Sequence, residues 1–382
     1  MKKIVIVGGG VCGISTAYHL KKHYPSDEVI LLEKDSSIGN RIKVSGNGRC
    51  NFSNENISDS DYKNGDKIKN ILSIYQGYEE EFYQQIHLYY YHDEEGRRYP
   101  ISNSSKTVLF LLTEALKQLG VKILTDTSVI DIEKKGEQIR LILNQGVIVT
   151  DIAIITSGGA SYFYSCDNYN FLQNLGLKFT NISPSLCPII LKEKIDKSIV
   201  GKRAKVNVKL FHDNKLIFCE KGEIIFKKDG ISGIVIFNVS SYINRYNLDI
   251  NRCELHIDFI PEINILELNR LIEQTSLSFA YKSLLCAEIS EYLLLNVSYN
   301  EEIKDKIYHL KDLYPLRESQ VTSGGISCEE INFDNLSLKR YPNIFVGGEV
   351  IDVDGKCGGY NIHFALACGY FIAKNLENKK HN

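Results

Sequence analysis

The chain has 382 residues, of which 43% are hydrophobic and 24% are charged, an ordinary composition for a globular protein of two or three domains. A formal net charge of −2 and a pI near 6.5 give no electrostatic reason to expect a nucleic-acid partner or an anionic membrane surface. No apolar run approaches the length of a bilayer span, and the N-terminal residues lack a signal-peptide pattern. We therefore expect a soluble, cytoplasmic protein without a nucleic-acid or membrane partner.

The ten cysteines are scattered, and no two form a CxxC pair. Neither zinc-ligand spacing nor a dithiol redox motif is therefore present, and no metal site is predicted. We interpret most cysteines as small buried side chains in a reducing compartment. Cys50 and Cys357 lie in glycine-rich stretches and are the two candidates for a chemical role. Packing is the favoured role for both.

The first 33 residues have the order of a dinucleotide-binding unit. An apolar run over residues 2–7 predicts a strand buried on both faces, and residues 14–20 predict a helix that packs against it. Between them lies a GxGxxG motif at residues 8–13. A second predicted strand, residues 28–32, ends on Glu33, twenty residues after the last glycine. The strand, the helix and the acid together make the motif far more specific than GxGxxG alone.

Each part of this fingerprint has a physical role. Gly8 permits the tight turn, Gly10 lets the backbone approach a pyrophosphate, and Gly13 lets the helix pack closely on the strand. The helix N-terminus offers free N–H groups and a positive dipole end to phosphates. Glu33 is suited to accept hydrogen bonds from a ribose diol. The fingerprint predicts a dinucleotide site.

Residues 34–54 are rich in glycine, asparagine and basic side chains and predict a long functional loop. Arg41, Lys43 and Arg49 are suited to hold a phosphate or an electron-rich ring, and the glycines allow close backbone approach. The alternative is a flexible surface connection, which would not need this density of Gly, Asn and Arg.

Residues 60–119 add further elements to the first domain. Residues 60–92 favour two helices and an edge strand, and residues 96–102 favour a loop. An amphipathic helix is predicted over residues 107–119, with Ser104 or Ser105 as its N-cap.

The next segments return the chain to the nucleotide. A strand over residues 121–124 precedes a hairpin within residues 128–143, where backbone groups near Val129 are expected to meet an adenine. A buried strand over residues 151–155 then leads into the turn Ser157–Gly159, at the pyrophosphate edge of the sheet.

The sequence pattern changes after residue 187. Short alternating segments up to residue 260 predict an antiparallel β domain, and residues 264–312 carry helical periodicity. The predicted strands are 189–191, 204–211, 216–219, 222–226, 233–237 and 253–259. Residues 320–327 then predict a strand and turn, and a final helix is predicted over residues 362–375.

Four stretches outside the fingerprint are distinctive. They are residues 43–54 (KVSGNGRCNFSN), 222–233 (GEIIFKKDGISG), 321–326 (VTSGGI) and 348–361 (GEVIDVDGKCGGYN). They resemble the K-x-x-S-G-x-G-R-C-N, G-E-[IL]-[LI]-F…G-[IV]-S-G, V-T-x-G-G-V and G-E-x-x-D-x-x-G-x-x-G-G-Y-N elements of one family. This family is the BaiN/YhiN-like flavoproteins, which include aminoacetone-oxidase-like enzymes. The resemblance covers nearly the whole chain.

The resemblance implies an α/β fold in which a Rossmann-type FAD-binding domain carries an inserted antiparallel β-barrel domain and a small helical lobe. We expect the FAD-binding domain over residues 1–187 and 314–382, the barrel over 188–262 and the lobe over 263–313. The turn at residues 358–362 would then face the isoalloxazine, where the helix dipole favours negative charge. The predicted FAD-binding residues are Gly8, Gly10, Val11, Cys12, Gly13, Glu33, Lys34, Arg41, Lys43, Ser45, Gly46, Gly48, Arg49, Cys50, Asn51, Val129, Ser157, Gly158, Gly348, Glu349, Asp352, Gly358, Gly359, Asn361 and Ile362. Of these, Asp352 is favoured as an organiser of the backbone.

The chain departs from the family at three places. A second glycine-rich turn is replaced by residues 162–168, and Lys356 and His363 stand where other residues are common. These differences bear on the substrate more than on FAD.

Only one dinucleotide fingerprint is present, so we expect NAD(P)H to bind transiently at the flavin face. The leading hypothesis is an FAD oxidoreductase that reduces an activated C=C bond of a small enoyl-type or steroid-type substrate with NAD(P)H. Reduction needs an acid beside the substrate, for which Tyr360, His363 and Arg49 are candidates. Loop anchoring and helix packing are the alternative roles of Tyr360 and His363.

Three other functions stay open. Within the same class, the alternative is oxidation of a small amine with oxygen as acceptor. An RNA-modifying flavoprotein would show a basic, aromatic stripe on the inserted domain, where acids are instead interspersed among the lysines. A flavin-binding sensor without turnover would leave the Arg and Asn residues of the 41–54 loop without a role. An enzyme is the favoured interpretation.

Overall fold

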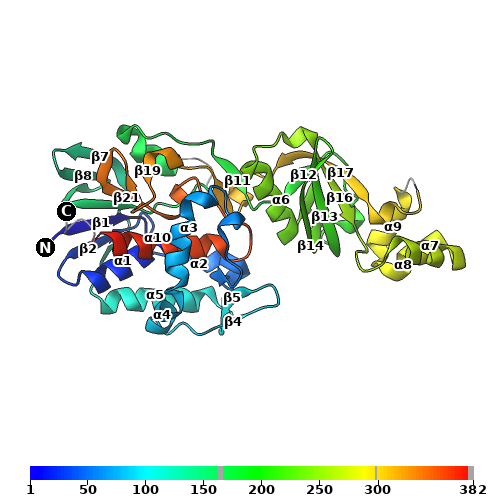
Figure 1. The fold of residues 1–382 in the computed structure, drawn as a ribbon, viewed down its shortest axis with the longest axis horizontal. Helices are drawn as coiled ribbons and strands as arrows, with labels where there is room; N and C mark the ends of the chain where they lie inside the picture. The colour runs from blue at the N-terminus through cyan, green and yellow to red at the C-terminus, as the bar shows by residue number, and fades with distance from the viewer. Residues whose placement is uncertain (162–166, 297–298, 377–382) are drawn as a thin grey trace. The chain divides into compact units, whose positions relative to one another are not determined.

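The computed structural model describes residues 1–161, 167–296 and 299–376. The chain forms two compact units (Figure 1). The first consists of Met1–Ile182 and Thr322–Asn382, and the second of Ser183–Val321. The first unit is therefore built from both ends of the chain, and the second is an insertion.

A seven-stranded sheet forms the centre of the first unit. Its strands are β1 (Lys3–Val7), β2 (Glu28–Leu32), β6 (Lys122–Leu124), β10 (Ile152–Ile155), β19 (Ile331–Asn332), β20 (Ser337–Leu338) and β21 (Tyr341–Val346). The order is β19-β20-β21-β10-β1-β2-β6, and β21, β10, β1, β2 and β6 run parallel. Four consecutive side chains of β1 and four of β2 are buried, as the sequence predicts for strands covered on both faces.

Six α-helices belong to the described part of the first unit. They are α1 (Val11–His23), α2 (Asn40–Val44), α3 (Gly65–Gln76), α4 (Glu79–Gln85), α5 (Ser105–Gln118) and α10 (Tyr360–Asn375). The first and last of these, α1 and α10, lie side by side although they come from opposite ends of the chain (Figure 1). Gly369 permits this approach, since a Cβ there would lie 2.5 Å from Ser15 Oγ, and that hydroxyl donates to Leu366 O at 2.9 Å.

Two small antiparallel sheets complete the first unit. They are formed by β3 (Ser53–Asn54), β5 (Arg97–Pro100) and β4 (Tyr90–His92), and by β7 (Val129–Lys135), β8 (Gln138–Leu143) and β9 (Gly146–Thr150). The prediction of a loop over residues 96–102 is wrong, because Arg97 and Arg98 pair with strand β3, more than 40 residues earlier in the chain.

The 34–54 segment is also more regular than expected. It contains α2, a turn of 3₁₀ helix over Ser45–Gly48, and β3. The helix predicted from residue 107 begins at Ser105. Ser104 takes the N-cap position without a side-chain hydrogen bond, and Ser105 Oγ instead donates to Lys43 O at 2.8 Å.

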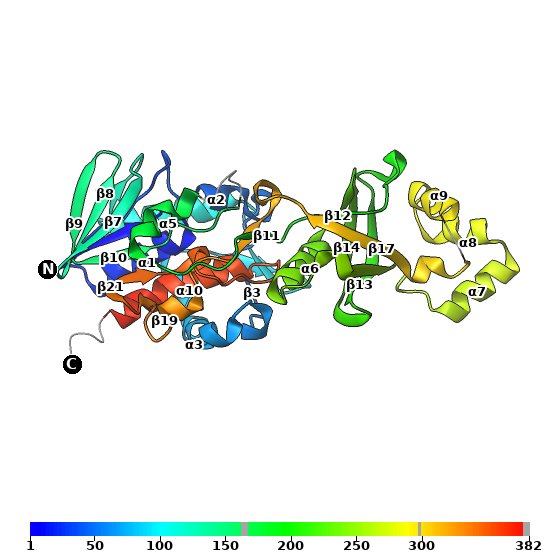
Figure 2. The same cartoon turned by 90° about the horizontal axis from the view of Figure 1, so that it is seen from above.

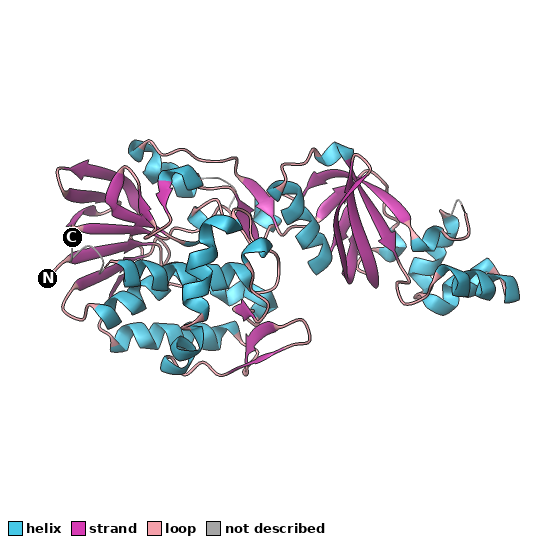
Figure 3. Cartoon of the chain, in the orientation of Figure 1, coloured by secondary structure: helices cyan, strands magenta, loops and turns pink. Residues whose placement is uncertain are grey.

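The second unit is a closed six-stranded antiparallel barrel with added helices, which confirms the predicted inserted barrel (Figure 3). Its strands are β12 (Ile189–Leu191), β13 (Arg203–His212), β14 (Lys215–Lys227), β15 (Gly230–Ser232), β16 (Cys253–Asp258) and β17 (Lys306–Leu313). Alternate residues of β13, among them Val206, Val208 and Leu210, fill the interior. The remaining elements are β11 (Ser183–Ser185), α6 (Ile234–Arg245), α7 (Ile265–Gln274), α8 (Leu277–Leu284) and α9 (Ala287–Leu295) (Figure 2). The boundary between the two units falls within β18 (Val321–Ser323).

Three predictions in this unit are corrected. Residues 233–237 begin helix α6 rather than a strand, because the apolar run continues at helical spacing to Val239 and Ile243, both buried. The two strands predicted within 216–226 are the single strand β14. Residues 306–312, expected to be helical, lie in β17, which closes the barrel by pairing with β12 and β16. None of the described helices has the length and apolar character needed to cross a bilayer.

Candidate FAD site

The turn between β1 and α1 has the geometry of a phosphate cradle. Gly8 has a φ of +105°, and a Cβ there would lie 2.5 Å from Thr156 O. A Cβ at Gly13 would lie 2.0 Å from Gly8 O, so α1 approaches the turn this closely only with glycine. A Cβ at Gly10, in contrast, would meet nothing within 4 Å. The space beside Gly10 is open to a ligand.

Polar groups at this cradle fit a pyrophosphate. Gly10 is the N-cap of α1 and supplies no side-chain hydrogen bond to the first helical turn, which also carries no acid. Ser157, which follows β10, has a buried hydroxyl without a hydrogen-bond partner among the described residues. A buried hydroxyl of this kind is costly unless a ligand or water satisfies it. The neighbouring replacement at residues 162–166 lies outside the described residues.

Glu33 braces the glycine turn. One carboxylate oxygen accepts the Gly9 N–H at 2.8 Å, and the other accepts the Asp35 N–H at 3.0 Å. The backbone of Thr127 donates to Glu33 O at 2.9 Å, which brings the segment before Val129 to the same place. The predicted ribose and adenine positions therefore lie next to each other.

Arg41 acts on the site through the protein. Its guanidinium donates to Gly159 O at 2.7 Å, to Ser161 O at 2.9 Å and to Ser161 Oγ at 3.0 Å. It also pairs with Glu349 at 3.1 Å, and Glu349 accepts the Thr322 N–H at 2.7 Å. Arg41 thus holds the turn after β10, which carries Ser157 and Gly158.

The other predicted basic residues are more exposed. Lys34 and Lys43 are exposed, and Lys43 Nζ donates to Asn40 Oδ1 at 2.8 Å. Arg49 is also exposed, and its guanidinium lies 4.7 Å from the centre of the Tyr99 ring. No carboxylate pairs with Arg49 in the part of the chain that the structure describes.

The loop that presents Arg49 has an unusual backbone. Gly46, Gly48 and Cys50 have φ values of +54°, +83° and +60°, and the last of these is strained because cysteine carries a Cβ. Burial raises the pKa of the Cys50 thiol to about 11, although the Ser45 hydroxyl opposes the shift. Cys50 is thus an inert, packed thiol at neutral pH, in line with the favoured interpretation.

Three predicted segments meet around one small apolar cavity. Val11 at the start of α1, Cys50 and Ile362 at the start of α10 all line it. Gly348 approaches α1 as well, since a Cβ there would lie 3.0 Å from the Cβ of Cys12. The first turns of α1 and α10 therefore lie close together, as expected if both border one cofactor.

Residues 51–54 hold the turn before α10. A Cβ at Gly359, which has a φ of +98°, would lie 2.3 Å from Ser53 O. Asn54 donates to Gly358 O at 3.0 Å. With its amide nitrogen turned toward Ser53 O, Asn51 accepts the Gly359 N–H at 3.2 Å. The Asn361 amide is used differently, because it bonds both the N–H and the C=O of Gly355.

Asp352 and Tyr360 are anchors of the surrounding backbone. Asp352 is buried and pairs with Lys63 at 2.7 Å, and Asn64 donates to Asp352 O at 2.7 Å. Tyr360 is buried, and its carbonyl accepts the Tyr62 hydroxyl at 2.9 Å. A backbone-organising role of Asp352 and a loop-anchoring role of Tyr360 would use such contacts, and both roles stay predictions.

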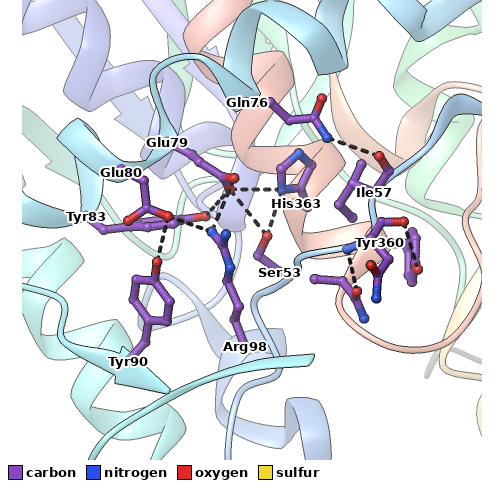
Figure 4. A network of polar contacts seen from close by, with 12 residues as sticks. Ser53, Ile57, Gln76, Glu79, Glu80, Tyr83, Tyr90, Arg98, Tyr360 and His363 are labelled. Carbon is purple, nitrogen blue, oxygen red and sulfur yellow. Dashed lines mark hydrogen bonds and ion pairs between the residues drawn. The ribbon is translucent and has the colours of Figure 1, made fainter. Parts of the chain in front are cut away.

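His363, Ser53, Glu79 and Tyr83 are buried and form a cluster with Arg98, whose side chain is 11% exposed (Figure 4). This group is named the buried charge cluster. His363 Nδ1 is 2.9 Å from Ser53 Oγ and 3.4 Å from Glu79 Oε2. Tyr83 donates to Glu79 at 3.1 Å, and Arg98 pairs with Glu79 at 3.2 Å. Burial alone would raise the pKa of the Glu79 carboxyl, but its contacts with His363, Arg98 and Tyr83 outweigh burial and lower it. Glu79 is thus ionised at neutral pH.

Sequence reasoning missed Ser53 as a side chain, Glu79 and Arg98. A weak signal for the last two existed, since three acids stand in the first turn of α4 and two adjacent arginines stand in β5. Nothing in the sequence relates these segments to each other.

Comparisons with known proteins identify the family of the chain. The family model described as HI0933-like protein Rossmann domain matches residues 2–375. A 3-dehydro-bile acid delta(4,6)-reductase of Clostridium scindens is 27% identical over 98% of both chains. A ribosomal RNA dihydrouridine synthase of Haemophilus influenzae is 23% identical, also over 98% of both chains. A 3-ketosteroid-delta4-(5alpha)-dehydrogenase structure from Rhodococcus jostii has a TM-score of 0.52 at 11% identity, covering 97% of this chain and 96% of that one, a likeness of fold alone.

Proposed function

On the premise that the chain belongs to the HI0933-like Rossmann family of FAD-dependent oxidoreductases, we propose that it reduces a C=C bond conjugated to a carbonyl group, with NAD(P)H as electron donor. FAD, when bound, supplies the hydride transfer. The protein groups of the cradle, the 45–50 loop and the N-terminal turn of α10 bind FAD and shape the space beside it.

The observation that carries the proposal is the chemistry shared by two relatives of full length. Reduction of a 3-dehydro-Δ4,6 bile acid and formation of dihydrouridine both add hydrogen across a C=C bond that is conjugated to a carbonyl. The substrates differ greatly, whereas the bond change is the same. Similarity over 98% of each chain supports assigning this bond change, rather than either substrate, to the present protein.

Arg49 is the acid candidate that solvent reaches, because Tyr360 and His363 are both buried. A guanidinium stays protonated at neutral pH, so Arg49 would orient and polarise the substrate carbonyl by hydrogen bonding, with the proton delivered by solvent. The guanidinium lies over the ring of Tyr99, and its Nε donates to Gly46 O at 3.4 Å. NAD(P)H is proposed to use the same face, since one dinucleotide cradle is found in the described part of the chain.

The test is anaerobic turnover with a 4-ene-3-oxo steroid, using NADH and NADPH in separate reactions and mass spectrometry of the product. The proposal predicts a product heavier by two hydrogens and its loss in Arg49→Met, with FAD still bound. Amine oxidation in air without any reduction of the enone would overturn the proposal in favour of an oxidase.

Reduction of uridine in ribosomal RNA is a second candidate, favoured by the relative that bears this activity in its name. The charge of the inserted unit counts against this candidate, because residues 183–321 carry as many Asp and Glu as Lys and Arg. Incubation with ribosomal RNA lacking dihydrouridine, followed by nucleoside analysis, separates the two substrates. Dihydrouridine formed in RNA but no reduced steroid would identify the RNA function.

A further inference from the structure

The buried charge cluster of Ser53, Glu79, Tyr83, Arg98 and His363 is an unusual feature of the first unit. His363 is 0% exposed, and Glu79 is 7% exposed while holding a negative charge. Burying an ion pair costs desolvation energy that an apolar packing of the same volume would avoid, so such a cluster is weak evidence for stability. A role beyond stability therefore needs to be sought in what the cluster touches.

The cluster touches the N-terminal turn of α10 through two of its members. The backbone N–H of His363 donates to Gly359 O at 3.0 Å. The Ser53 carbonyl oxygen packs against Gly359 so closely that a Cβ there would lie only 2.3 Å from it. The side chains of His363 and Ser53 bond each other at 2.9 Å. This turn is predicted to face the isoalloxazine of FAD, and its Ile362 lines one small apolar cavity together with Val11 at the start of α1.

The two nitrogens of His363 differ in their surroundings. Nδ1 faces Ser53 Oγ and Glu79 Oε2, whereas Nε2 is buried with no hydrogen-bond partner among the described residues. The ring edge lies against Tyr75, with ring centres 5.1 Å apart. Only Nδ1 is therefore in a position to pass on the effect of the Glu79 carboxylate.

We propose that Glu79 is a positioning residue of the FAD site, which acts through His363 Nδ1 and Ser53 to fix the N-terminal turn of α10 against the cofactor. Arg98 and Tyr83 hold the carboxylate in place. The inference rests on FAD binding by this family and not on the identity of the substrate.

The decisive comparison is between two substitutions of one residue. Asparagine at position 363 carries polar atoms two bonds from Cβ, the same number of bonds as Nδ1 of histidine. Glutamine carries them three bonds from Cβ, as Nε2 of histidine is. We expect His363→Asn to release FAD at a rate within about twofold of the wild type. His363→Gln and Glu79→Gln are expected to release it at least about tenfold faster, the effect of losing roughly 1.4 kcal/mol. Both should also shift the midpoint potential of the FAD that stays bound.

Glu80→Gln is the matched control. Glu80 also pairs with Arg98, at 2.9 Å, but its side chain is 52% exposed. In the described part of the chain, no hydrogen bond or ion pair joins Glu80 to His363 or Ser53. The FAD release rate and potential of Glu80→Gln should equal those of the wild type. A lower melting temperature in Glu79→Gln, with release rate and potential unchanged, would overturn the proposal and leave a structural role. Equal FAD release rates of His363→Asn and His363→Gln would overturn the proposal too. If Glu79→Gln does not fold, the comparison of these two variants is the test.

The measurements need no substrate. Failure of the enzyme to reduce any C=C bond would therefore leave this proposal standing, and failure of the proposal would leave the proposed reaction standing.

Discussion

The glycine cradle of the candidate FAD site and the buried charge cluster are built in opposite ways. The cradle uses backbone, and its shape comes from the absence of side chains at Gly8, Gly10 and Gly13. The cluster uses side chains brought together from β3, α4, β5 and α10. The difference teaches that the cradle, which is suited to the common portion of a dinucleotide, is encoded locally, whereas the cluster is assembled over long distances in the chain.

The largest expected effect separates two glycines within the cradle. Gly13→Ala places a Cβ 2.0 Å from Gly8 O, so α1 must shift, which should lower the melting temperature and weaken FAD binding roughly 100-fold, about 2.7 kcal/mol. Gly10→Ala meets no protein atom within 4 Å, so the apoprotein should melt as the wild type does while FAD binding still falls. Thermal melts and FAD titrations measure both quantities. Equal melting temperatures for the two variants would contradict this assignment of roles.

A smaller effect is expected where a side chain supports the cradle. Arg41→Lys keeps the charge but loses the fork that bonds Gly159 O, Ser161 and Glu349 together. We expect FAD to bind about tenfold more weakly, corresponding to about 1.4 kcal/mol. Lys106→Gln is the control, since Lys106 is exposed and is not among the predicted FAD-binding residues. FAD titrations that show an equal loss in both variants would count against a special role for Arg41.

Much of the fold could be predicted from the sequence. Residues 3–33 were predicted because the βαβ unit, its glycines and Glu33 are neighbours in the chain, where hydrophobic period and spacing act locally. The strand β5 was missed because its hydrogen bonds go to Ser53 and Asn54 in β3. Helix α6 was mistaken for a strand because its first residues are β-branched, and only the later Val239 and Ile243 reveal the helical period.

The same limit applies to the candidate site. Gly10 and Gly13 were recognised from spacing, but the partners of Arg41 and His363 were not. Arg41 reaches Glu349 across 308 positions, and His363 reaches Ser53 across 310. A single sequence holds no signal for such pairs, because neither residue type nor local period depends on the partner.

The smallest effect contrasts His363 with a buried histidine that has no polar partner. His19 in α1 is surrounded by Tyr18, Tyr78, Phe82 and Tyr370, and neither ring nitrogen has a hydrogen-bond partner among the described residues. Burial, with the nearby charges of His23 and Lys22, lowers the pKa of His19 well below its ordinary value. Below about pH 6.5, His19 is therefore protonated in the unfolded chain but stays neutral in the folded protein.

It follows that the free energy of unfolding decreases as the pH falls below about 6.5, by up to about 1.4 kcal/mol per pH unit from this group. His19→Phe should remove this part of the pH dependence. Urea denaturation at pH 7.5 and pH 5.5 gives the difference for each protein. The same decrease in wild type and variant would show that His19 is not the source.

The central claim is that this is an FAD enzyme that takes electrons from a nicotinamide and passes them to a conjugated C=C bond. The most direct measurement is anaerobic addition of NADPH, and separately NADH, to the purified protein while the flavin band near 450 nm is followed. The account predicts a yellow protein that bleaches rapidly with at least one of the two and regains its colour when a 4-ene-3-oxo steroid or another conjugated enone is added. A yellow protein that neither nicotinamide bleaches would contradict the proposed electron donor, and a colourless protein that binds no added FAD would contradict the site itself.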